Sequence, residues 1–430
     1  MQIIKYPARK DWSELLMRPS FDSSSLEETV KNILADVKAN GDEAVRKFTL
    51  QFDKVQITDL RVNDKEIDKA EQSVSAELKQ SIVTAKNNIE QFHAVQLDKI
   101  EVVETMPGVQ CWRRSTPIEK IGLYIPGGSA PLFSTILMLA VPARLAGCKE
   151  IILCSPPNPA GQLNPAILFT AAIAGITRIF RAGGVQAIGA MSYGTTSIPK
   201  VYKIFGPGNQ YVTCAKQLVQ KEGVAIDLPA GPSEVAVYAD ETANPPFIAA
   251  DLLSQAEHGI DSQVLLITDH SLLIDAVITE IDKQIAELPR KNIALKALEN
   301  SKCILVKDQT EAIDLLNEYA PEHLILACTD PDDVAQKISN AGSVFLGHYS
   351  PESVGDYASG TNHTLPTNGY ARSYSGVSVD SFVKKITFQK LTEAGLKNLG
   401  RTVEVMAEAE GLIGHKNAVS IRRQKLEDRR

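Results

Sequence analysis

The first hundred residues have the apolar spacing of amphipathic helices. Between residues 64 and 97, apolar side chains recur at every third or fourth position, which places them on one face of a helix. A shorter stretch at 26–40 repeats the pattern and ends at Gly41, as helices often do. No chemistry-bearing pattern accompanies these helices, so we predict that they form a packing scaffold. The apolar positions of the longest stretch are Ile67, Ala70, Val74, Leu78, Ile82, Ala85 and Ile89.

From residue 118 onward, short apolar runs alternate with segments of helical periodicity. Such repeated β-α units predict a parallel sheet whose two faces are covered by helices. Two series of predicted strands follow one another along the chain. The first lies at 121–124, 150–154, 178–180 and 201–205, and the second at 235–239, 263–267, 303–306, 323–327 and 344–346.

These series predict an α/β fold with two Rossmann-like parallel-sheet domains, one inserted in the other. We expect residues 118–232 to form the inserted domain. The helical N-terminal part, residues 1–117, is expected to pack with residues 233–380 as the larger α/β domain. The pattern at 381–430 predicts a short strand and two helices. This C-terminal tail would need another surface to pack on.

Composition and charge narrow the class of protein. The chain has 430 residues, more than a single core of about 250–300 residues accommodates. A formal net charge of −7 without a long basic block argues against nucleic acid as a partner. The N-terminus lacks the apolar core of a signal peptide, and the apolar run at 131–141 is too short to cross a membrane. Six scattered cysteines without a C-x-x-C pair indicate reduced thiols, so we expect a cytoplasmic protein.

Glycine-rich turns follow the predicted strands of the inserted domain. Because the carboxyl ends of parallel strands share one edge of a sheet, these turns would form one rim. Glycine there allows backbone N–H groups to approach a phosphate. There is no G-x-G-x-x-G motif, so the pattern leaves open whether the rim binds a dinucleotide or consists only of tight turns. The turns lie at 126–128, 183–184, 206–209 and 230–233.

Four polar side chains form a candidate metal-ligand set. Gln255 and His258 are three residues apart at the end of the helix predicted for 245–257, so both project from one face. Asp356 lies in a stretch that we interpret as a flexible polar loop, and His415 lies in a turn between the two tail helices. Nitrogen and oxygen ligands without thiolate suit Zn²⁺, Mn²⁺ or Co²⁺. Spacing alone does not show that the four converge, and a helix end whose histidine bonds a carbonyl remains the alternative for Gln255 and His258.

Glu322 and His323 are adjacent titratable residues at the start of a predicted strand. A carboxylate beside an imidazole at one edge of a sheet suits general acid–base catalysis near neutral pH. A polar pair that faces a loop without a catalytic role is the alternative that the pattern leaves open.

Five motifs, in order along nearly the whole chain, together resemble the histidinol dehydrogenase family. They are IDLPAGPSEV at 226–235, LSQAEHG at 253–259, APEHL at 320–324, GDY at 355–357 and EGLIGH at 410–415. The resemblance implies two successive NAD-dependent oxidations of L-histidinol, through L-histidinaldehyde to L-histidine, at the last step of histidine biosynthesis. It also implies a homodimer with one Zn²⁺ per site and with each site shared between the subunits.

The resemblance further implies roles for individual residues. Zinc would be bound by Gln255, His258 and Asp356 of one subunit and by His415 of the other. Substrate would contact Ser233, Gln255, His258, His323, Asp356, Glu410 and His415. NAD would contact Tyr124, Gln186 and Asn209, and the catalytic pair would be Glu322 and His323.

A reaction scheme follows from these roles. Zinc would position a substrate that carries two nitrogen ligands, His323 would take the alcohol proton, and Glu322 would activate water for attack on the aldehyde. A thiohemiacetal at Cys111 or Cys148 is disfavoured, because neither thiol has an evident activating base. Two other classes remain open. One is a related zinc- and NAD-dependent dehydrogenase for another polar alcohol, and the other is a non-catalytic metal-dependent binding protein.

Overall fold

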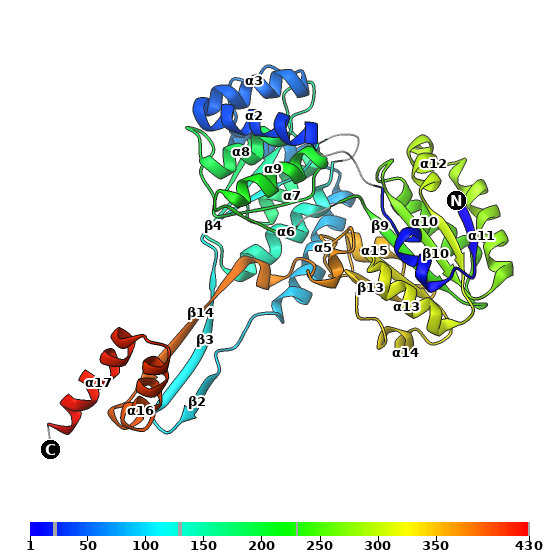
Figure 1. The fold of residues 1–430 in the computed structure, drawn as a ribbon. Helices are drawn as coiled ribbons and strands as arrows, with labels where there is room; N and C mark the ends of the chain where they lie inside the picture. The colour runs from blue at the N-terminus through cyan, green and yellow to red at the C-terminus, as the bar shows by residue number, and fades with distance from the viewer. Residues whose placement is uncertain (20–23, 128–130, 229–230, 429–430) are drawn as a thin grey trace.

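The structure, a computed structural model, describes residues 1–19, 24–127, 131–228 and 231–428 (Figure 1). Of the turns and motifs considered above, Gly128, Pro229 and Ala230 lie outside the described residues. Within them the strands form two parallel sheets and one antiparallel ribbon. The two parallel sheets confirm the predicted α/β class.

The larger sheet has six strands in the order β1-β11-β10-β9-β12-β13. Successive residues of its strands alternate between two apolar cores. In β9, Val235 and Val237 face the core under α10, α11 and α12, whereas Ala236 and Tyr238 face the core under α1 and α13. The strands are β1 (Gln2–Lys5), β9 (Glu234–Ala239), β10 (Gln263–Thr268), β11 (Lys302–Leu305), β12 (His323–Ala327) and β13 (Ser343–Leu346). The helices are α1 (Trp12–Leu15), α10 (Pro245–Ala256), α11 (Ser271–Ile285), α12 (Lys291–Glu299), α13 (Gln309–Tyr319) and α14 (Pro331–Ala335).

The inserted domain holds a five-stranded parallel sheet in the order β6-β5-β4-β7-β8. Its strands are β4 (Lys120–Tyr124), β5 (Glu150–Ser155), β6 (Arg178–Arg181), β7 (Lys203–Phe205) and β8 (Ala225–Ile226). Its helices are α6 (Phe133–Ala146), α7 (Pro165–Ile173), α8 (Gly184–Tyr193) and α9 (Gln210–Lys221). Among the described residues, neither α6 nor any other helix combines the length and the apolar composition that crossing a bilayer requires.

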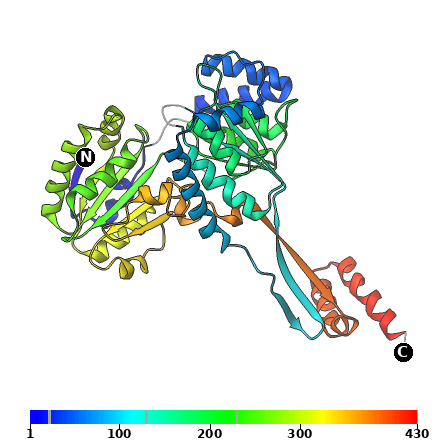
Figure 2. The ribbon, with the colours of Figure 1, turned by 180° about the vertical axis from the view of Figure 1, so that it is seen from behind.

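The N-terminal helices pack mainly on the inserted domain, so the prediction that they pack with residues 233–380 is wrong. Helices α2 and α3 lie over α8 and α9, and α4 and α5 lie over α7 and α6 (Figures 1 and 2). The physical reason is that α6 and α8 are buried nearly all round, so a second layer has to cover their outer sides. The covering helices are α2 (Ser24–Asn40), α3 (Asp42–Asp53), α4 (Asp64–Ser73) and α5 (Ala76–Ala94).

The first residues of the chain join the larger sheet instead. Strand β1 pairs in parallel with β11, and Trp12 and Leu16 lie in the core beneath α13. The predicted N-terminal part is also not helical throughout, because residues 102–117 form strands β2 (Val102–Met106) and β3 (Val109–Pro117). The two ends of residues 1–117 therefore join different sheets. Strand β1 joins the larger sheet, and β2 and β3 join the antiparallel ribbon.

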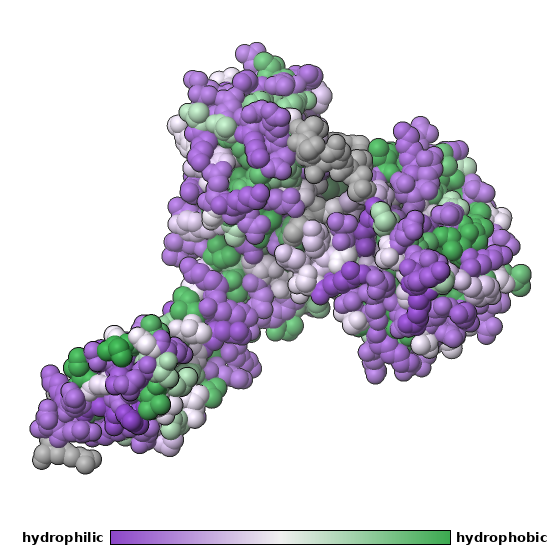
Figure 3. Space-filling model, viewed as in Figure 1, coloured by the Kyte–Doolittle hydropathy of each residue, from purple (hydrophilic) through white to green (hydrophobic). Residues whose placement is uncertain are grey.

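An arm extends away from both domains (Figure 2). It consists of the antiparallel ribbon β14-β3-β2 and the tail helices, which contact one another. The strand and two helices predicted for 381–430 are confirmed as β14 (Val383–Leu391), α16 (Glu393–Ala409) and α17 (Ile413–Glu427). Figure 3 shows apolar residues on the surface of this arm. The exposed ones on or between the tail helices are Val405, Met406, Leu412, Ile413 and Ile421.

The carboxyl edge of the inserted sheet lies beside the amino edge of the larger sheet. Strand β8 ends at Ile226, and β9 begins at Glu234. A hydrogen bond of 3.0 Å between Nε2 of His363 and Oγ1 of Thr135 joins the larger domain to the first turn of α6. The candidate residues of the two domains are thereby gathered at one junction.

Candidate active site

Glu322 and His323 lie at the amino edge of the larger sheet, where β12 begins beside β9. Both side chains are buried, at 6% and 3% exposure. The backbone N–H of Glu234, the first residue of β9, donates to Oε2 of Glu322 over 2.8 Å. Nδ1 of His323 contacts the backbone oxygen of Glu234 at 3.1 Å. The two side chains are therefore buried against β9 in fixed positions and do not face a loop, and their catalytic role stays a prediction.

Burial and neighbouring charges shift the pKa values of both groups. Burial raises the pKa of Glu322, although the neighbouring His323 opposes the shift. Burial alone would lower the pKa of His323, but the carboxylates of Glu322 and Asp356 outweigh it and raise this pKa well above its usual value. Oε2 of Glu322 lies 3.6 Å from Nδ1 of His323, so the protonation of each group affects the other.

Asp356 lies in a short helix, α15 (Glu352–Tyr357), so the interpretation of this stretch as a flexible loop is wrong. The helix has no apolar stripe of its own and is fixed by buried polar contacts. Oδ1 of Asp356 contacts Nε2 of His323 at 3.1 Å. Burial tends to raise the pKa of Asp356, but His323, His363 and His258 together lower it. The ionised carboxylate is thus available as a ligand.

Gln255 provides the strongest local sign of a missing ligand. Its side chain is buried in the last turn of α10, and neither Oε1 nor Nε2 makes a hydrogen bond of normal geometry among the described residues, although the amide lies close enough to Glu352 to oppose the rise that burial causes in the pKa of that carboxyl. An unpaired buried amide costs about 1–3 kcal/mol, which a bound group would offset. His258 follows at the end of the same helix. Burial lowers its pKa, although the charge of Asp356 opposes this shift. An amide oxygen, an imidazole and a carboxylate are donor types that fit zinc.

The expected zinc ligands do not all come together within one chain. In the part of the chain that the structure describes, no three histidine, cysteine, aspartate or glutamate side chains are arranged to hold a metal ion. His415, in the first turn of α17, and Glu410, at the end of α16, are exposed on the arm. Figure 1 shows this arm far from α10 and α15, so the structure does not bring these two residues to the other candidates within one chain.

Two further residues near this site are functional candidates that the sequence pattern did not indicate. Nδ1 of His363 donates to the backbone oxygen of Asp356 at 2.7 Å, and its Nε2 pairs with Oγ1 of Thr135. Glu352 is 1% exposed, bonds Ser254, and has its pKa raised by burial to about 7. The signal for His363 was its place seven residues after Asp356 in a polar segment. Ser233, expected to contact substrate, immediately precedes Glu234 at the same sheet edge.

The expected NAD contacts lie at the carboxyl edge of the inserted sheet. Tyr124 ends β4, and its hydroxyl accepts a hydrogen bond from the backbone N–H of Gly184 at 3.1 Å. Gln186, two residues on in α8, has a buried Oε1 without a partner among the described residues. Asn209 caps α9 by accepting from the backbone N–H groups of Tyr211 and Val212. The structure thus brings Tyr124 and Gln186 together, with Asn209 on the turn after the neighbouring strand β7.

A cleft of about 350 Å³ lies on the same rim. It is lined by Gly127, by residues 156–159 after β5, and by Asp53 at the end of α3. One carboxylate oxygen of Asp53 is buried without a partner among the described residues, and burial raises the pKa of this residue to about 6. An N-terminal helix therefore contributes to the rim, which the sequence analysis did not foresee.

Comparison with known proteins identifies the family. The family model described as histidinol dehydrogenase matches residues 16–423. This chain belongs to the histidinol dehydrogenase family. The histidinol dehydrogenase of Bacteroides thetaiotaomicron is 60% identical over 98% of this chain and 99% of its own length. That of Yersinia pestis is 52% identical over 95% of this chain and 92% of its own length.

A solved structure of the family shares the fold over its whole length. The crystal structure of histidinol dehydrogenase from Elizabethkingia anophelis has a TM-score of 0.97 with this chain at 56% identity, and 99% of each chain is covered. The resemblance that the five motifs predicted is therefore confirmed. Members of the family are NAD-dependent, zinc-binding oxidoreductases of histidine biosynthesis.

Proposed function

We propose that this chain catalyses two successive NAD-dependent oxidations, of L-histidinol to L-histidinaldehyde and of the aldehyde to L-histidine. Membership of the histidinol dehydrogenase family supports the reaction. The observation that carries the proposal is the buried Glu322–His323 pair, whose imidazole contacts Asp356 at 3.1 Å. Acid–base groups and the expected zinc ligands are thus neighbours at one sheet edge, opposite the rim proposed for NAD.

The cofactors have defined places in this proposal. When bound, zinc supplies a template for a substrate rich in nitrogen, and NAD⁺ supplies the hydride acceptor. Gln255, His258 and Asp356 would hold zinc together with His415 of a second subunit. Tyr124, Gln186 and Asn209 would contact NAD. Ser233 and Glu410 would contact the substrate.

The chain's own residues perform the proton transfers. His323 takes the hydroxyl proton of histidinol in the first oxidation. The raised pKa of His323 and the contact of its Nε2 with Asp356 indicate an imidazole that is protonated at rest. Nε2 therefore has to release its proton and its contact with this carboxylate before it can accept the hydroxyl proton. In the second oxidation Glu322 accepts a proton from the water that attacks the aldehyde. Its raised pKa suits a base that works near neutral pH.

A covalent route through cysteine is opposed by the environment of the thiols. Burial raises the pKa of Cys148 to about 12, and its Sγ–H points toward the backbone oxygen of Phe382. Cys111 belongs to β3 in the arm, away from the catalytic pair. Neither thiol is activated as a nucleophile requires.

The arm supports the proposal of a homodimer with shared sites. Its exposed apolar side chains are typical of a surface that another chain covers. A second subunit that covers this arm would receive His415 and Glu410 in its own site and so complete the zinc ligands. The six free cysteines suit the cytoplasm, where a biosynthetic enzyme of this family would act.

One assay tests the proposal. The purified protein is given L-histidinol and NAD⁺, with and without a chelator. We expect about two NADH per histidinol, loss of turnover on chelation, and recovery on addition of Zn²⁺. Absence of NADH formation by the zinc-loaded protein would refute the proposed reaction. Reduction of NAD⁺ by another polar alcohol, but not by L-histidinol, would reassign the substrate.

A further inference from the structure

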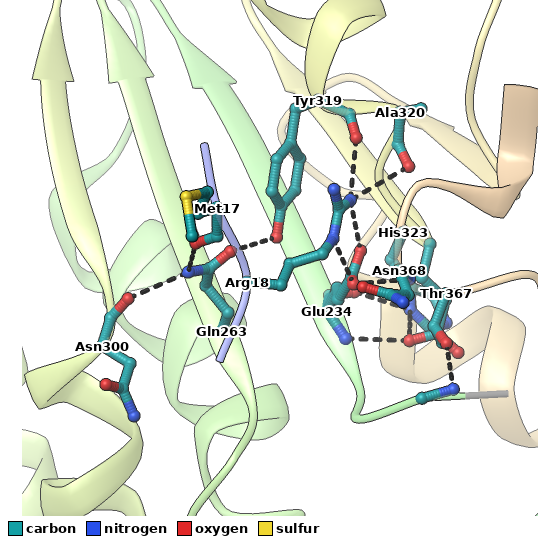
Figure 4. A network of polar contacts seen from close by, with 12 residues as sticks. Met17, Arg18, Glu234, Gln263, Asn300, Tyr319, Ala320, His323, Thr367 and Asn368 are labelled. Atoms are coloured by element: carbon teal, nitrogen blue, oxygen red, sulfur yellow. Dashed lines mark hydrogen bonds and ion pairs between the residues drawn. The ribbon is translucent and has the colours of Figure 1, made fainter. Parts of the chain in front are cut away.

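A buried polar network lies beside the catalytic pair (Figure 4). At its centre is Arg18, from the segment that follows α1. The side chain of Arg18 is 14% exposed, and that of its partner Glu234 is 2% exposed. Nearly complete burial makes this ion pair unlike the exposed pairs on the surface, because removal of one partner leaves the other charged and buried.

Arg18 holds Glu234 through two parallel hydrogen bonds. Nε donates to Oε1 at 2.6 Å, and a terminal nitrogen donates to Oε2 at 2.9 Å. This forked geometry fixes the direction of the carboxylate as well as its distance. The backbone N–H of Asn368 adds a third bond to the same carboxylate at 2.7 Å. The side chain of Glu234 therefore has one defined position.

The backbone of Glu234 in turn holds both catalytic side chains. Its N–H donates to Oε2 of Glu322 at 2.8 Å, and its carbonyl oxygen contacts Nδ1 of His323 at 3.1 Å. The residue that Arg18 fixes is thus the residue that sets the position of the base and the orientation of the imidazole.

Arg18 also holds the chain that leads into the catalytic pair. A terminal nitrogen donates to the backbone oxygens of Tyr319 at 2.7 Å and Ala320 at 3.4 Å, and the guanidinium stacks on the Tyr319 ring at 4.0 Å. Ala320 has φ 53° and ψ 65°, a left-handed conformation that costs a residue with a side chain about 1 kcal/mol or more. Two residues later comes Glu322. Arg18 thereby stabilises the strained turn from which the pair projects.

The segment that carries Arg18 is itself fixed. The amide of Gln263 donates to the backbone oxygens of Met17 at 3.2 Å and Asn300 at 3.1 Å. The hydroxyl of Tyr319 donates to the same Gln263 side chain at 2.9 Å. Arg18 therefore meets Glu234 from a rigid support rather than from a free N-terminal strand.

We propose that Arg18 is a positioning residue for the reaction, which holds Glu322 and His323 in catalytic geometry through Glu234 and the Tyr319–Ala320 turn. The inference rests on the proposed function, since it assigns Arg18 to the acid–base pair of that reaction. Among the described residues, the hydrogen bonds, ion pair and ring contact of Arg18 involve only Glu234, Tyr319 and Ala320, none of which is an expected zinc, substrate or NAD residue. Its loss should therefore slow the chemical steps and leave binding unchanged.

The test compares Arg18→Ala and Arg18→Lys with Arg9→Ala. Arg9 belongs to the same N-terminal segment and pairs with Asp314 on α13, but it is exposed and remote from the pair. We expect Arg18→Ala to lower kcat for histidinol about 10–100-fold, because small displacements of catalytic groups cost this much. KM for histidinol and the zinc content should stay near the wild-type values. Arg18→Lys, which keeps the charge but not the fork, should retain the fold and still lose about 3–10-fold in kcat.

A double variant separates positioning from a merely structural role. In a Glu322→Gln background, Arg18→Ala should lower the rate of aldehyde oxidation by less than it does in the wild-type chain, since the base that it positions is already gone. Equal losses in both backgrounds, or a kcat of both Arg18 variants equal to that of Arg9→Ala, would overturn the inference. A parallel fall in zinc content would do the same. Turnover by the wild-type enzyme tests the proposed function separately, because every variant is measured relative to it.

Discussion

The substitution Glu322→Gln should separate the two oxidations. Glutamine has the shape of glutamate, and its amide oxygen can still accept the hydrogen bond from the backbone N–H of Glu234 at 2.8 Å. Burial already disfavours the charged form of Glu322, so a neutral replacement should change the free energy of unfolding by only about 1 kcal/mol. The change therefore removes a base while leaving the site in place.

The expected kinetic loss depends on which catalytic groups the variant retains. General base catalysis contributes about 10²–10⁴-fold, so the aldehyde oxidation should slow by this factor, which corresponds to about 3–5 kcal/mol of activation free energy. The alcohol oxidation keeps His323 and should slow by no more than about 10-fold. Part of that loss would come from the missing charge at 3.6 Å from Nδ1, which helps to set the pKa of His323.

Rapid-mixing measurements of NADH can detect this difference. With excess NAD⁺, the variant should form about one NADH per site quickly and the second slowly, and L-histidinaldehyde as substrate should give only the slow phase. Glu318→Gln, an exposed change on α13 that loses a contact with Arg372, is the matched control and should behave as wild type. Equal losses on histidinol and on the aldehyde would refute the division of roles between Glu322 and His323.

Two further predictions concern the shared site and the rim. His258→Ala and His415→Ala chains should each be inactive alone, but dissociation and reassociation of an equal mixture should restore about a quarter of the wild-type activity, since half the dimers are hybrids with one intact site. No recovery, in a mixture that size exclusion shows to have exchanged subunits, would contradict sharing. Asp53→Asn should raise the melting temperature at pH 8 and have little effect at pH 4. The raised pKa of about 6 means that the wild-type fold loses stability as Asp53 ionises between about pH 4 and 6. A difference in melting temperature that does not grow with pH would contradict this account.

The alternation of apolar runs and helical segments was sufficient to predict both parallel sheets. It also placed Glu322 and His323 at the start of a strand, because a buried run such as HLILA has few other conformations open to it. The surface on which a helix packs cannot be predicted in the same way. The stripe from Ile67 to Ile89 indicates that one face is buried, but not whether α6 or the larger sheet covers it, because that choice depends on residues far away in the sequence.

The sequence predicted the helix that ends at Gln255 and His258, and the structure has α10 end there. The binding of zinc by these two residues stays a prediction. Asp356 was identified as a candidate ligand, but its helix was missed, since α15 is short and is stabilised by buried polar contacts rather than by an apolar stripe. His363 was missed for a related reason. Its bonds to Asp356 and Thr135 link two domains, and nothing in the local pattern around residue 363 indicates such a link.

Arg18 shows most clearly what local sequence patterns do not reveal. It is a single arginine before Pro19, and its partners Glu234 and Tyr319 lie 216 and 301 residues away. A charged residue in a polar segment is normally solvated, so the sequence favours that interpretation. The structure reverses it, because β1 and α1 carry the N-terminal segment across the larger sheet to the amino edge where β9 and β12 begin. The same packing that places the N-terminus on the fold therefore brings a buried cation behind the acid–base pair, and the stability of this edge and the geometry of the reaction depend on one set of contacts.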